Sequence, residues 1–350
     1  MINLNYLYFT VSGNYVLSNQ KFTWHGAKSR GNFATPNINI MSSLVTVDNL
    51  NNLKNEEAWV GYYSKETAFA YIGCLLIKNE NPKALFSRAN NNPGICFSVC
   101  KKYNQNYIGL NGGKCFCMQE RPSKNINRPA CDISPDGIFV KGGVHKADDY
   151  MSIYVRIKTD INVTNHNGQI GGKCLSFERK STIEYQWSAC INSYQFLCTK
   201  NSNQHAEFQN LPLSAWRHYV KTCFEHNCLP ITYNDKLSST VDENVGLSWT
   251  NVIRSDVIYK YHETSNVISI DGSEKYGFIK KSGNITNMYF TNNSANSKWY
   301  LLQTRKLTEP NVLTTFTSRN ATQTTFASVT SNHFTPPVDN THIIISKDFL

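Results

Sequence analysis

Two stretches of the chain share one pattern of hydrophobic and polar positions. Residues 22–31 (FTWHGAKSRG) predict a short amphipathic helix that opens on a tryptophan, and residues 56–71 (EEAWVGYYSKETAFAY) predict a strand led by a second tryptophan. Residues 214–223 (SAWRHYVKTC) and 246–261 (GLSWTNVIRSDVIYKY) follow the same order. The two tryptophans are 35 residues apart in the first copy and 33 apart in the second. These matches indicate an internal repeat.

Each copy continues into a second half with matching spacing. Short β-branched and aromatic runs, broken by Asn, Gly and Ser, predict strands in both halves. Residues 171–198 carry cysteines spaced by 16 and then 8 residues, namely Cys174, Cys190 and Cys198. Residues 275–302 carry three residues at the same intervals, namely Phe278, Ser294 and Leu302.

These features resemble the C-type lectin-like domain, with its Trp-x2-Ala helix, its AWVGYY strand and its closing cysteines. The resemblance implies an α+β fold in which two helices flank twisted antiparallel sheets, with a long loop region that often binds ligands. A first, interrupted domain would join residues 1–73 to residues 158–200. A second, degenerate domain would cover residues 208–305.

The cysteines depart from the family's usual pattern. The family places a cysteine seven residues after the helix tryptophan and pairs it with the last cysteine of the domain. In the first copy that position is Gly31, which leaves Cys198 without an evident partner. In the second copy it is Cys223, but Leu302 occupies the partner position. Cys223 could therefore pair with the nearby Cys228 or with Cys198.

Calcium-dependent sugar binding in this family needs a Glu/Gln-Pro-Asn/Asp loop and a Trp-Asn-Asp strand. Ca²⁺ requires roughly six to eight oxygen ligands. Residues 187–189 read Trp-Ser-Ala, and neither EPN nor QPD occurs in the chain. We therefore expect no metal site and no cofactor.

A cysteine-rich insertion, residues 71–157, separates the halves of the first copy. It contains CFSVC (96–100) and YIGLNGGKCFC (107–117). Structural zinc knuckles use C-x2-C or C-x4-C spacing, which these sequences lack, and the redox C-x-x-C spacing is also absent. A disulfide framework fits this spacing better.

The insertion, over residues 71–155, resembles the WSC domain, an extracellular, disulfide-rich, PAN/apple-like module to which carbohydrate binding is ascribed. The matching features are YIGC (71–74), the two sequences above, Cys131, a Gly-Gly pair and the closing MSIYV. The family usually has two further cysteines, at the positions of Pro135 and Lys141. The six remaining cysteines could close three disulfides, and they are Cys74, Cys96, Cys100, Cys115, Cys117 and Cys131.

The chain has 11 cysteines, so at least one thiol is free or is paired outside the chain. Outside the insertion the disulfide candidates are Cys174, Cys190, Cys223 and Cys228. Four glycosylation sequons occur in polar contexts, at Asn162, Asn284, Asn292 and Asn320. Together, the cysteines and sequons indicate the secretory pathway and an extracellular or cell-surface location.

Four residues near the Gly112-Gly113 turn could bind a sugar, because sugar sites combine an aromatic face with amides that address hydroxyl groups. They are Tyr103, Asn106, Tyr107 and Asn111. The alternative is structural, with Tyr107 packed on the disulfides and the asparagines capping turns.

The net charge of +10 comes from scattered Lys and Arg residues that form no run of five or six. We therefore expect no nucleic-acid partner, although acidic glycans or membrane surfaces would be attracted. No G-x-S-x-G, HExxH, P-loop or G-x-G-x-x-G sequence occurs, so we do not expect an enzyme.

Residues 306–350 are rich in Thr and Ser and predict an extended, O-glycosylated stalk. No window of 18 apolar residues occurs, and the first twenty residues make a poor signal peptide. We therefore expect membrane attachment only if the native chain extends beyond residue 350, as in a truncated receptor ectodomain. A secreted form stays open.

Taken together, the sequence predicts an extracellular or cell-surface protein that recognises polysaccharides or glycoprotein glycans without calcium. The alternative is an adhesion or scaffold ectodomain that binds protein partners and no sugar.

Overall fold

The computed structural model describes much of the chain between residues 9 and 303. The described residues are 9–12, 15–40, 45–47, 53, 56–77, 84–87, 91–120, 122, 131–133, 138–142, 150–157, 161, 163, 172–199, 207–208, 213–226, 228–233, 246–262 and 274–303. All of them belong to the first of two compact units, Met1–Lys306. The predicted stalk, residues 306–350, lies outside the described residues.

The described part is rich in β-structure, with few helices and five disulfides. The main path of its largest sheet, in spatial order, is β3 (Ile38–Asn39), β4 (Val45–Val47), β19 (Ile285–Thr291), β18 (Lys275–Ser282), β5 (Glu57–Leu76), β11 (Tyr150–Arg156), β7 (Tyr107–Asn111), β8 (Lys114–Met118) and β6 (Ala84–Ser87). An α+β, disulfide-rich class is compatible with these elements.

Further strands branch from this path. They are β17 (Ser248–Lys260), β12 (Cys174–Arg179), β13 (Ile183–Ser188), β20 (Trp299–Gln303), β2 (Tyr15–Leu17) and β1 (Phe9–Ser12). Two small sheets are separate, one of β9 (Asp132–Ile133) with β10 (Val140–Lys141), the other of β14 (Leu197–Thr199) with β15 (Glu207–Phe208) and β16 (Leu229–Pro230). The helices are α1 (Trp24–Ser29), α3 (Pro93–Cys100) and α4 (Trp216–Glu225), and a 3-10 turn, η1 (Lys101–Tyr103), follows α3.

Two of the helices begin at clear sequence signals. Thr23 caps α1, its hydroxyl accepting a hydrogen bond from the N–H of Gly26 at 3.0 Å. Asn92 caps α3 through the N–H of Ile95 at 2.9 Å, and a proline occupies the first turn of that helix. Both caps satisfy backbone donors that a helix start leaves unpaired.

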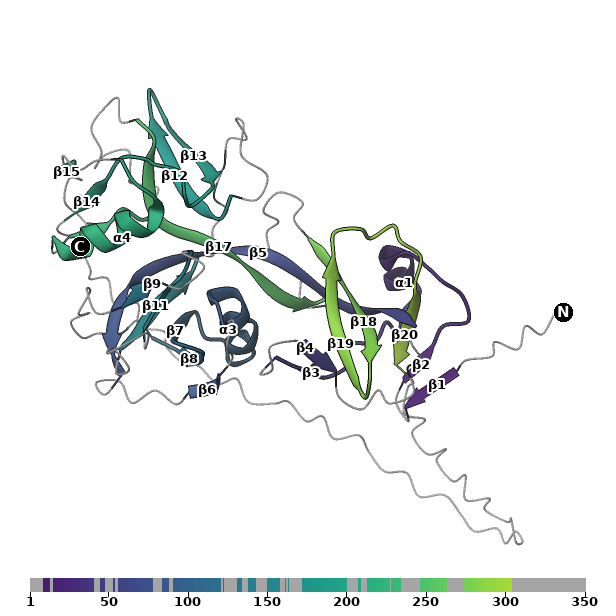
Figure 1. Cartoon of the computed structure of the whole chain (residues 1–350). Coiled ribbons are helices and arrows are strands. Elements are labelled where there is room, and N and C mark those ends of the chain that lie inside the picture. Colours follow the sequence, from purple (N-terminus) through teal and green to yellow (C-terminus); the bar gives the residue numbers. More distant parts are fainter. Residues whose placement is uncertain are drawn as a thin grey trace, which may run out of the picture. The chain divides into compact units, whose positions relative to one another are not determined.

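Strand β5 runs beside partners from several parts of the chain (Figure 1). Its first residues pair with β18 and β20, its middle with β17 and its end with β11. Nearly every residue of β5 is buried instead of every second one. Continuous burial is expected of a strand with both faces covered.

The two copies of the repeat are confirmed by matching hydrogen bonds. In the first copy, the indole of Trp24 donates to the carbonyl of Val60 at 3.0 Å, and that of Trp59 donates to Phe22 at 2.9 Å. In the second copy, the corresponding bonds run from Trp216 to Thr250 at 2.7 Å and from Trp249 to Ser214 at 2.8 Å. Each helix tryptophan thus bonds the residue after the strand tryptophan, and each strand tryptophan bonds the residue two before the helix tryptophan.

The second halves, however, are exchanged between the copies. The N–H of Trp24 donates to the carbonyl of Ser294 at 3.1 Å, and the N–H of Trp216 donates to that of Cys190 at 2.9 Å. We call the described residues within 15–63 and 258–303 composite unit I, and those within 172–199 and 213–254 composite unit II. This grouping differs from the expected one, in which residues 1–73 join residues 158–200. Strand register decides it, because β18 pairs with β5 whereas β12 pairs with β17.

The structure also corrects one position in the alignment of the second halves. Cys174 lies opposite Ile253, four residues after Trp249, and Tyr276 lies opposite Tyr63, four residues after Trp59. Tyr276, and not Phe278, is therefore equivalent to Cys174. The equivalences of Cys190 with Ser294 and of Cys198 with Leu302 hold, because the stretch from Tyr276 to Ser294 is two residues longer than the stretch from Cys174 to Cys190.

A buried ionic cluster lies where β5 pairs with β17. The carboxylate of Glu66 accepts from the guanidinium of Arg254 at 2.9 Å and from the ammonium of Lys173. The side chains of Glu66 and Arg254 are each only 7% exposed. A buried carboxylate is tolerated only when paired in this way.

Helix α4 is anchored by one buried phenol. The hydroxyl of Tyr219 donates to the carbonyl of Leu197 at 2.9 Å and accepts from the N–H of Ile231 at 2.7 Å. Burial raises the pKa of Tyr219 above the ordinary tyrosine value, so the hydroxyl stays protonated as a donor.

No helix in the described ranges is long and apolar enough to span a bilayer.

Candidate binding site in the cysteine-rich module

The six cysteines of the insertion form three disulfides, as the sequence predicted. Cys74 pairs with Cys131, Cys96 with Cys115, and Cys100 with Cys117. The last two disulfides tie α3 to β8.

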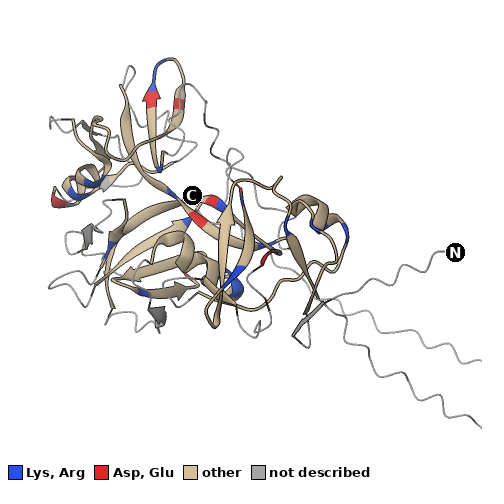
Figure 2. Cartoon of the chain, turned by 45° about the vertical axis from the view of Figure 1, so that its right-hand side comes forward, with Lys and Arg blue, Asp and Glu red and all other residues tan. Residues whose placement is uncertain are grey.

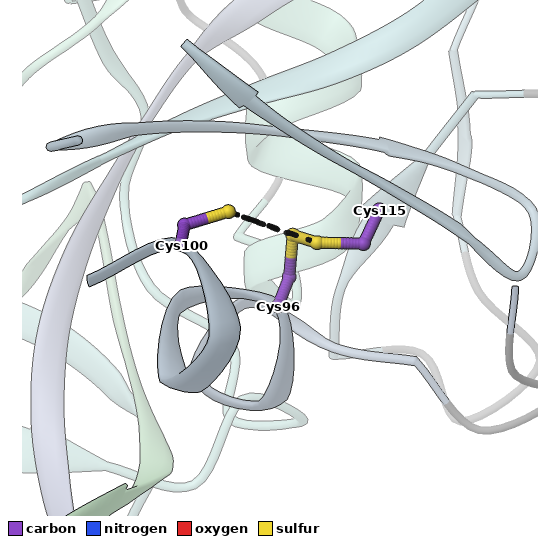
Figure 3. Close-up of side chains that lie close together, drawn as sticks. All are labelled: Cys96, Cys100 and Cys115. Atoms are coloured by element: carbon purple, nitrogen blue, oxygen red, sulfur yellow. Dashed lines mark hydrogen bonds between the residues drawn. A yellow bond between two sulfur atoms is a disulfide. The ribbon is translucent and has the colours of Figure 1, made fainter. Parts of the chain in front are cut away.

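The second and third of these disulfides bring three sulfur atoms as close together as the ligands of a metal site. The sulfurs of Cys96, Cys100 and Cys115 lie within 4.8 Å of one another, and Figure 3 shows them converging between the helix and the strand. The Cys96–Cys115 bond consumes two of these sulfurs, and Cys100 is bonded to Cys117. In this oxidised state the cluster is a pair of neighbouring disulfides, because metals bind thiolates.

The remaining cysteines correct one expectation. Cys174 pairs with Cys190, and Cys198 pairs with Cys223. Cys228, which we expected in a disulfide, is a buried free thiol. The exchange of repeat halves explains the pairing, because it brings the strand of Cys198 against α4, which carries Cys223.

The four candidate ligand-binding residues separate into two places. Tyr103 ends η1 and is 58% exposed, while Asn106 and Tyr107 follow as half-buried residues at the start of β7. Asn111 lies at the other end of β7, about 13 Å along the strand. It is buried, and its amide donates to the carbonyl of Tyr150 at 2.6 Å. Asn111 therefore has a structural role, whereas Tyr103, Asn106 and Tyr107 lie within five consecutive residues of the chain.

The turn that carries Tyr103 is fixed at both ends. It directly follows Cys100, whose disulfide holds it to β8. It ends at Asn104, whose φ of 55° is a left-handed conformation that asparagine tolerates better than most residues. Lys101, at its start, places its ammonium 4.3 Å from the centre of the Tyr259 ring. Tyr103 is thus held out to solvent on a constrained support.

Helix α3 packs directly on β17. The hydroxyl of Ser255 accepts from the N–H of Gly94 at 3.1 Å, and the hydroxyl of Ser98 accepts from the N–H of Ile258 at 2.9 Å. A Cβ at Gly94 would lie 2.2 Å from the carbonyl oxygen of Asp256, so only glycine permits this approach. These contacts place η1 next to the end of β17.

A pocket that the sequence did not predict lies beside η1. Its volume is about 150 Å³, and it is lined by residues from four separate segments, among them Asn37, Tyr62, Lys102 and Lys260. No local pattern marks these residues, because they come together only when β5, β17 and α3 have paired.

Two of the four sequons can be located. Asn284 lies in the turn between β18 and β19, Asn292 follows β19, and both side chains are exposed. Asn162 and Asn320 lie outside the described residues.

Lysines and arginines are spread over several elements, as the blue segments in Figure 2 show.

The chain matches no model of a known protein family, no curated protein and no solved structure.

Proposed function

We propose that this chain is an extracellular or cell-surface protein that binds glycans without calcium through the face of the cysteine-rich module that carries Tyr103. The observation that carries the proposal is the 58% exposure of that large aromatic side chain on a support fixed by the Cys100–Cys117 disulfide. An exposed phenol ring offers an apolar face for sugar C–H groups and a hydroxyl for their polar edges. Asn106 and Tyr107 are the neighbouring polar and aromatic contacts.

The predicted compartment is supported by the disulfides. Five disulfides are typical of proteins from oxidising compartments. The exposure of Asn284 and Asn292 agrees with their use as glycosylation sites.

The Cys198–Cys223 disulfide supports the proposed lectin-like architecture. The C-type lectin-like family, which the sequence resembles, usually pairs a cysteine seven residues after the helix tryptophan with the last cysteine of the domain. Composite unit II has this pair. Composite unit I has Gly31 and Leu302 at the equivalent positions, so it lacks both members together. Two lectin-like units with exchanged halves, holding a WSC-like module, would account for this pattern.

The proposal is tested by applying the oxidised full chain to a polysaccharide array, with and without a calcium chelator. We expect binding that the chelator leaves unchanged, and we expect Tyr103→Ala to weaken it about tenfold, which is ~1.4 kcal/mol. Leu213→Ala is the matched control, because Leu213 has the same 58% exposure but lies outside the module. Absence of binding to any glycan by the folded chain would refute the proposal.

A second candidate function is adhesion to a protein partner through composite unit II. Ile191 is 84% exposed and Leu213 is 58% exposed, and they flank the bridge between Tyr194 and Ser214. Exposed large aliphatic side chains are more typical of a protein contact than of a glycan site. Loss of a captured protein partner in Ile191→Asp/Leu213→Asp, with no glycan binding by the parent chain, would favour this alternative.

A further inference from the structure

The pocket beside η1 lies where the cysteine-rich module meets composite unit I. One wall is the end of α3 with η1, a second is the end of β17, and the others are Tyr62 of β5 and the segment from Asn37 to Ile40. Ligand sites occur preferentially at such interfaces between modules.

Lysines from two of these walls line the pocket. Lys101 and Lys260 are half-buried, and Lys102 is exposed. Among the described residues that line the pocket, none is acidic. A hollow lined by charges of one sign concentrates the opposite charge, so this pocket favours an anion.

The rest of the lining is uncharged, and it includes the hydroxyl-bearing side chains of Tyr62 and Ser98. Ile38 and Ile258 contribute aliphatic surface, and Asn37 contributes an exposed amide. A volume of about 150 Å³ is enough for one small ring, since engineered cavities of that size hold benzene. A single ring with a charged group fits this combination of surfaces better than a bare inorganic ion does.

We infer that this pocket binds one acidic sugar unit of a glycan, with its carboxylate or sulfate against the lysines and its C–H face against Ile38 and Ile258. The inference rests on the proposed glycan binding and names the class of glycan. Tyr103 directly follows Lys102 in the chain, within one Cα–Cα step of about 3.8 Å. Lys102 and Tyr103 are thus consecutive residues of η1, and an acidic glycan of more than one unit would be long enough to contact both.

The test is the affinity of the full, oxidised chain for three short oligosaccharides that differ in charge. One carries a uronic acid, one carries a sulfate ester, and one is neutral. Lys102→Gln/Lys260→Gln should weaken binding of the preferred acidic oligosaccharide about tenfold, and Lys102→Gln alone should weaken it by several-fold. The single variant guards against misfolding, because Lys102 is exposed. Comparison of the first two oligosaccharides identifies the acidic group.

The control for net charge is Lys114→Gln/Lys221→Gln, which removes the same two charges from residues that are exposed and do not line the pocket. It should change the affinity by less than about twofold. An equal loss in this control would overturn the inference, since binding would then follow overall charge. Unchanged affinity in the pocket variants would overturn it as well.

The two proposals fail in different ways. If the chain binds the neutral oligosaccharide, loses it in Tyr103→Ala and does not prefer either acidic one, only the pocket assignment fails. If no oligosaccharide binds, the proposed glycan binding fails too. The preference for an acidic oligosaccharide, lost in the pocket variants and kept in the control, supports both.

Discussion

Cys198 and Cys223 form a disulfide between β14 and α4, and both belong to composite unit II although the sequence repeat assigns them to different copies. The same exchange leaves Cys228 as a buried thiol.

We predict that alkylation of the denatured but unreduced protein labels a single cysteine, Cys228, and that reduction exposes all 11. Peptide mapping without reduction should recover Cys198 linked to Cys223. A peptide linking Cys223 to Cys228 would contradict the exchange of halves.

The tryptophan hydrogen bonds predict that two Trp→Phe variants lose similar amounts of stability. Trp59→Phe and Trp249→Phe each remove an indole donor whose carbonyl partner lies at 2.9 Å and 2.8 Å. Each carbonyl keeps a second hydrogen bond, Phe22 from the N–H of Lys298 and Ser214 from the N–H of Tyr194, so losing the indole bond should cost about 0.5–1.5 kcal/mol. Urea unfolding should show losses of similar size in both variants, because the two bonds are equivalent. A large loss in one variant and none in the other would argue against that equivalence.

The Glu66 cluster predicts a larger effect. Glu66→Gln leaves the guanidinium of Arg254 buried without its carboxylate, which we expect to lower the free energy of unfolding by about 3–5 kcal/mol. Glu178→Gln is the control, because its pair with Lys180 lies at the surface, with Lys180 exposed and Glu178 half-buried, and surface pairs contribute about 0–1 kcal/mol. Equal losses in the two variants, measured by urea unfolding, would show that burial of the cluster does not matter.

The ion pairs of Glu57 predict that the stability of the fold depends on pH. A hydrogen bond from Lys298 outweighs burial and, with the nearby charges of Lys298 and Lys280, holds the pKa of Glu57 below its ordinary value of 4.5. A lowered carboxyl pKa stabilises the fold above pH 4.5, and this contribution is lost as the pH falls through the lowered value. Glu57→Gln should therefore unfold more easily than the parent at pH 7, by about 0.5–1 kcal/mol, and the difference should shrink under acidic conditions. A difference that grows on acidification would contradict this sign.

The close approach of Gly94 to β17 leads to a prediction about how firmly α3 of the cysteine-rich module is held against that strand. Gly94→Ala puts a Cβ within 2.2 Å of the Asp256 carbonyl, and relieving that overlap should cost about 1–3 kcal/mol. Gly246→Ala, whose Cβ would meet its nearest atom at 3.5 Å, should cost less. Faster hydrogen exchange at Ile258 in Gly94→Ala alone would show that α3 has moved away from β17.

The sequence was sufficient for features that depend on local spacing. The tryptophan repeat and the six-cysteine set of the insertion are visible because each involves fixed intervals between residues of one type. The exchange of halves could not be predicted, since either second half offers the same strand pattern to either first half. Only the long-range register of β18 on β5 and of β12 on β17 distinguishes the two arrangements.

In the candidate site, too, local sequence patterns were predictable and long-range contacts were not. The Tyr103 region was predicted from composition near a turn, but the same pattern included Asn111, whose amide is used inside the module. An asparagine beside a Gly-Gly turn is equally suited to a ligand and to a backbone carbonyl. The lysines of the pocket could not be grouped, because Lys102 and Lys260 are 158 residues apart in the sequence.

The exchanged halves also set an order for folding during synthesis. Composite unit II is complete once residue 254 has been made, and its Cys198–Cys223 disulfide can close at that stage. Composite unit I must wait, since Trp24 needs the carbonyl of Ser294. The earliest residues of this unit thus stay without their partners for most of translation, a period in which unpaired strands are exposed to aggregation. Chaperone dependence should accordingly concentrate on the N-terminal part of the nascent chain.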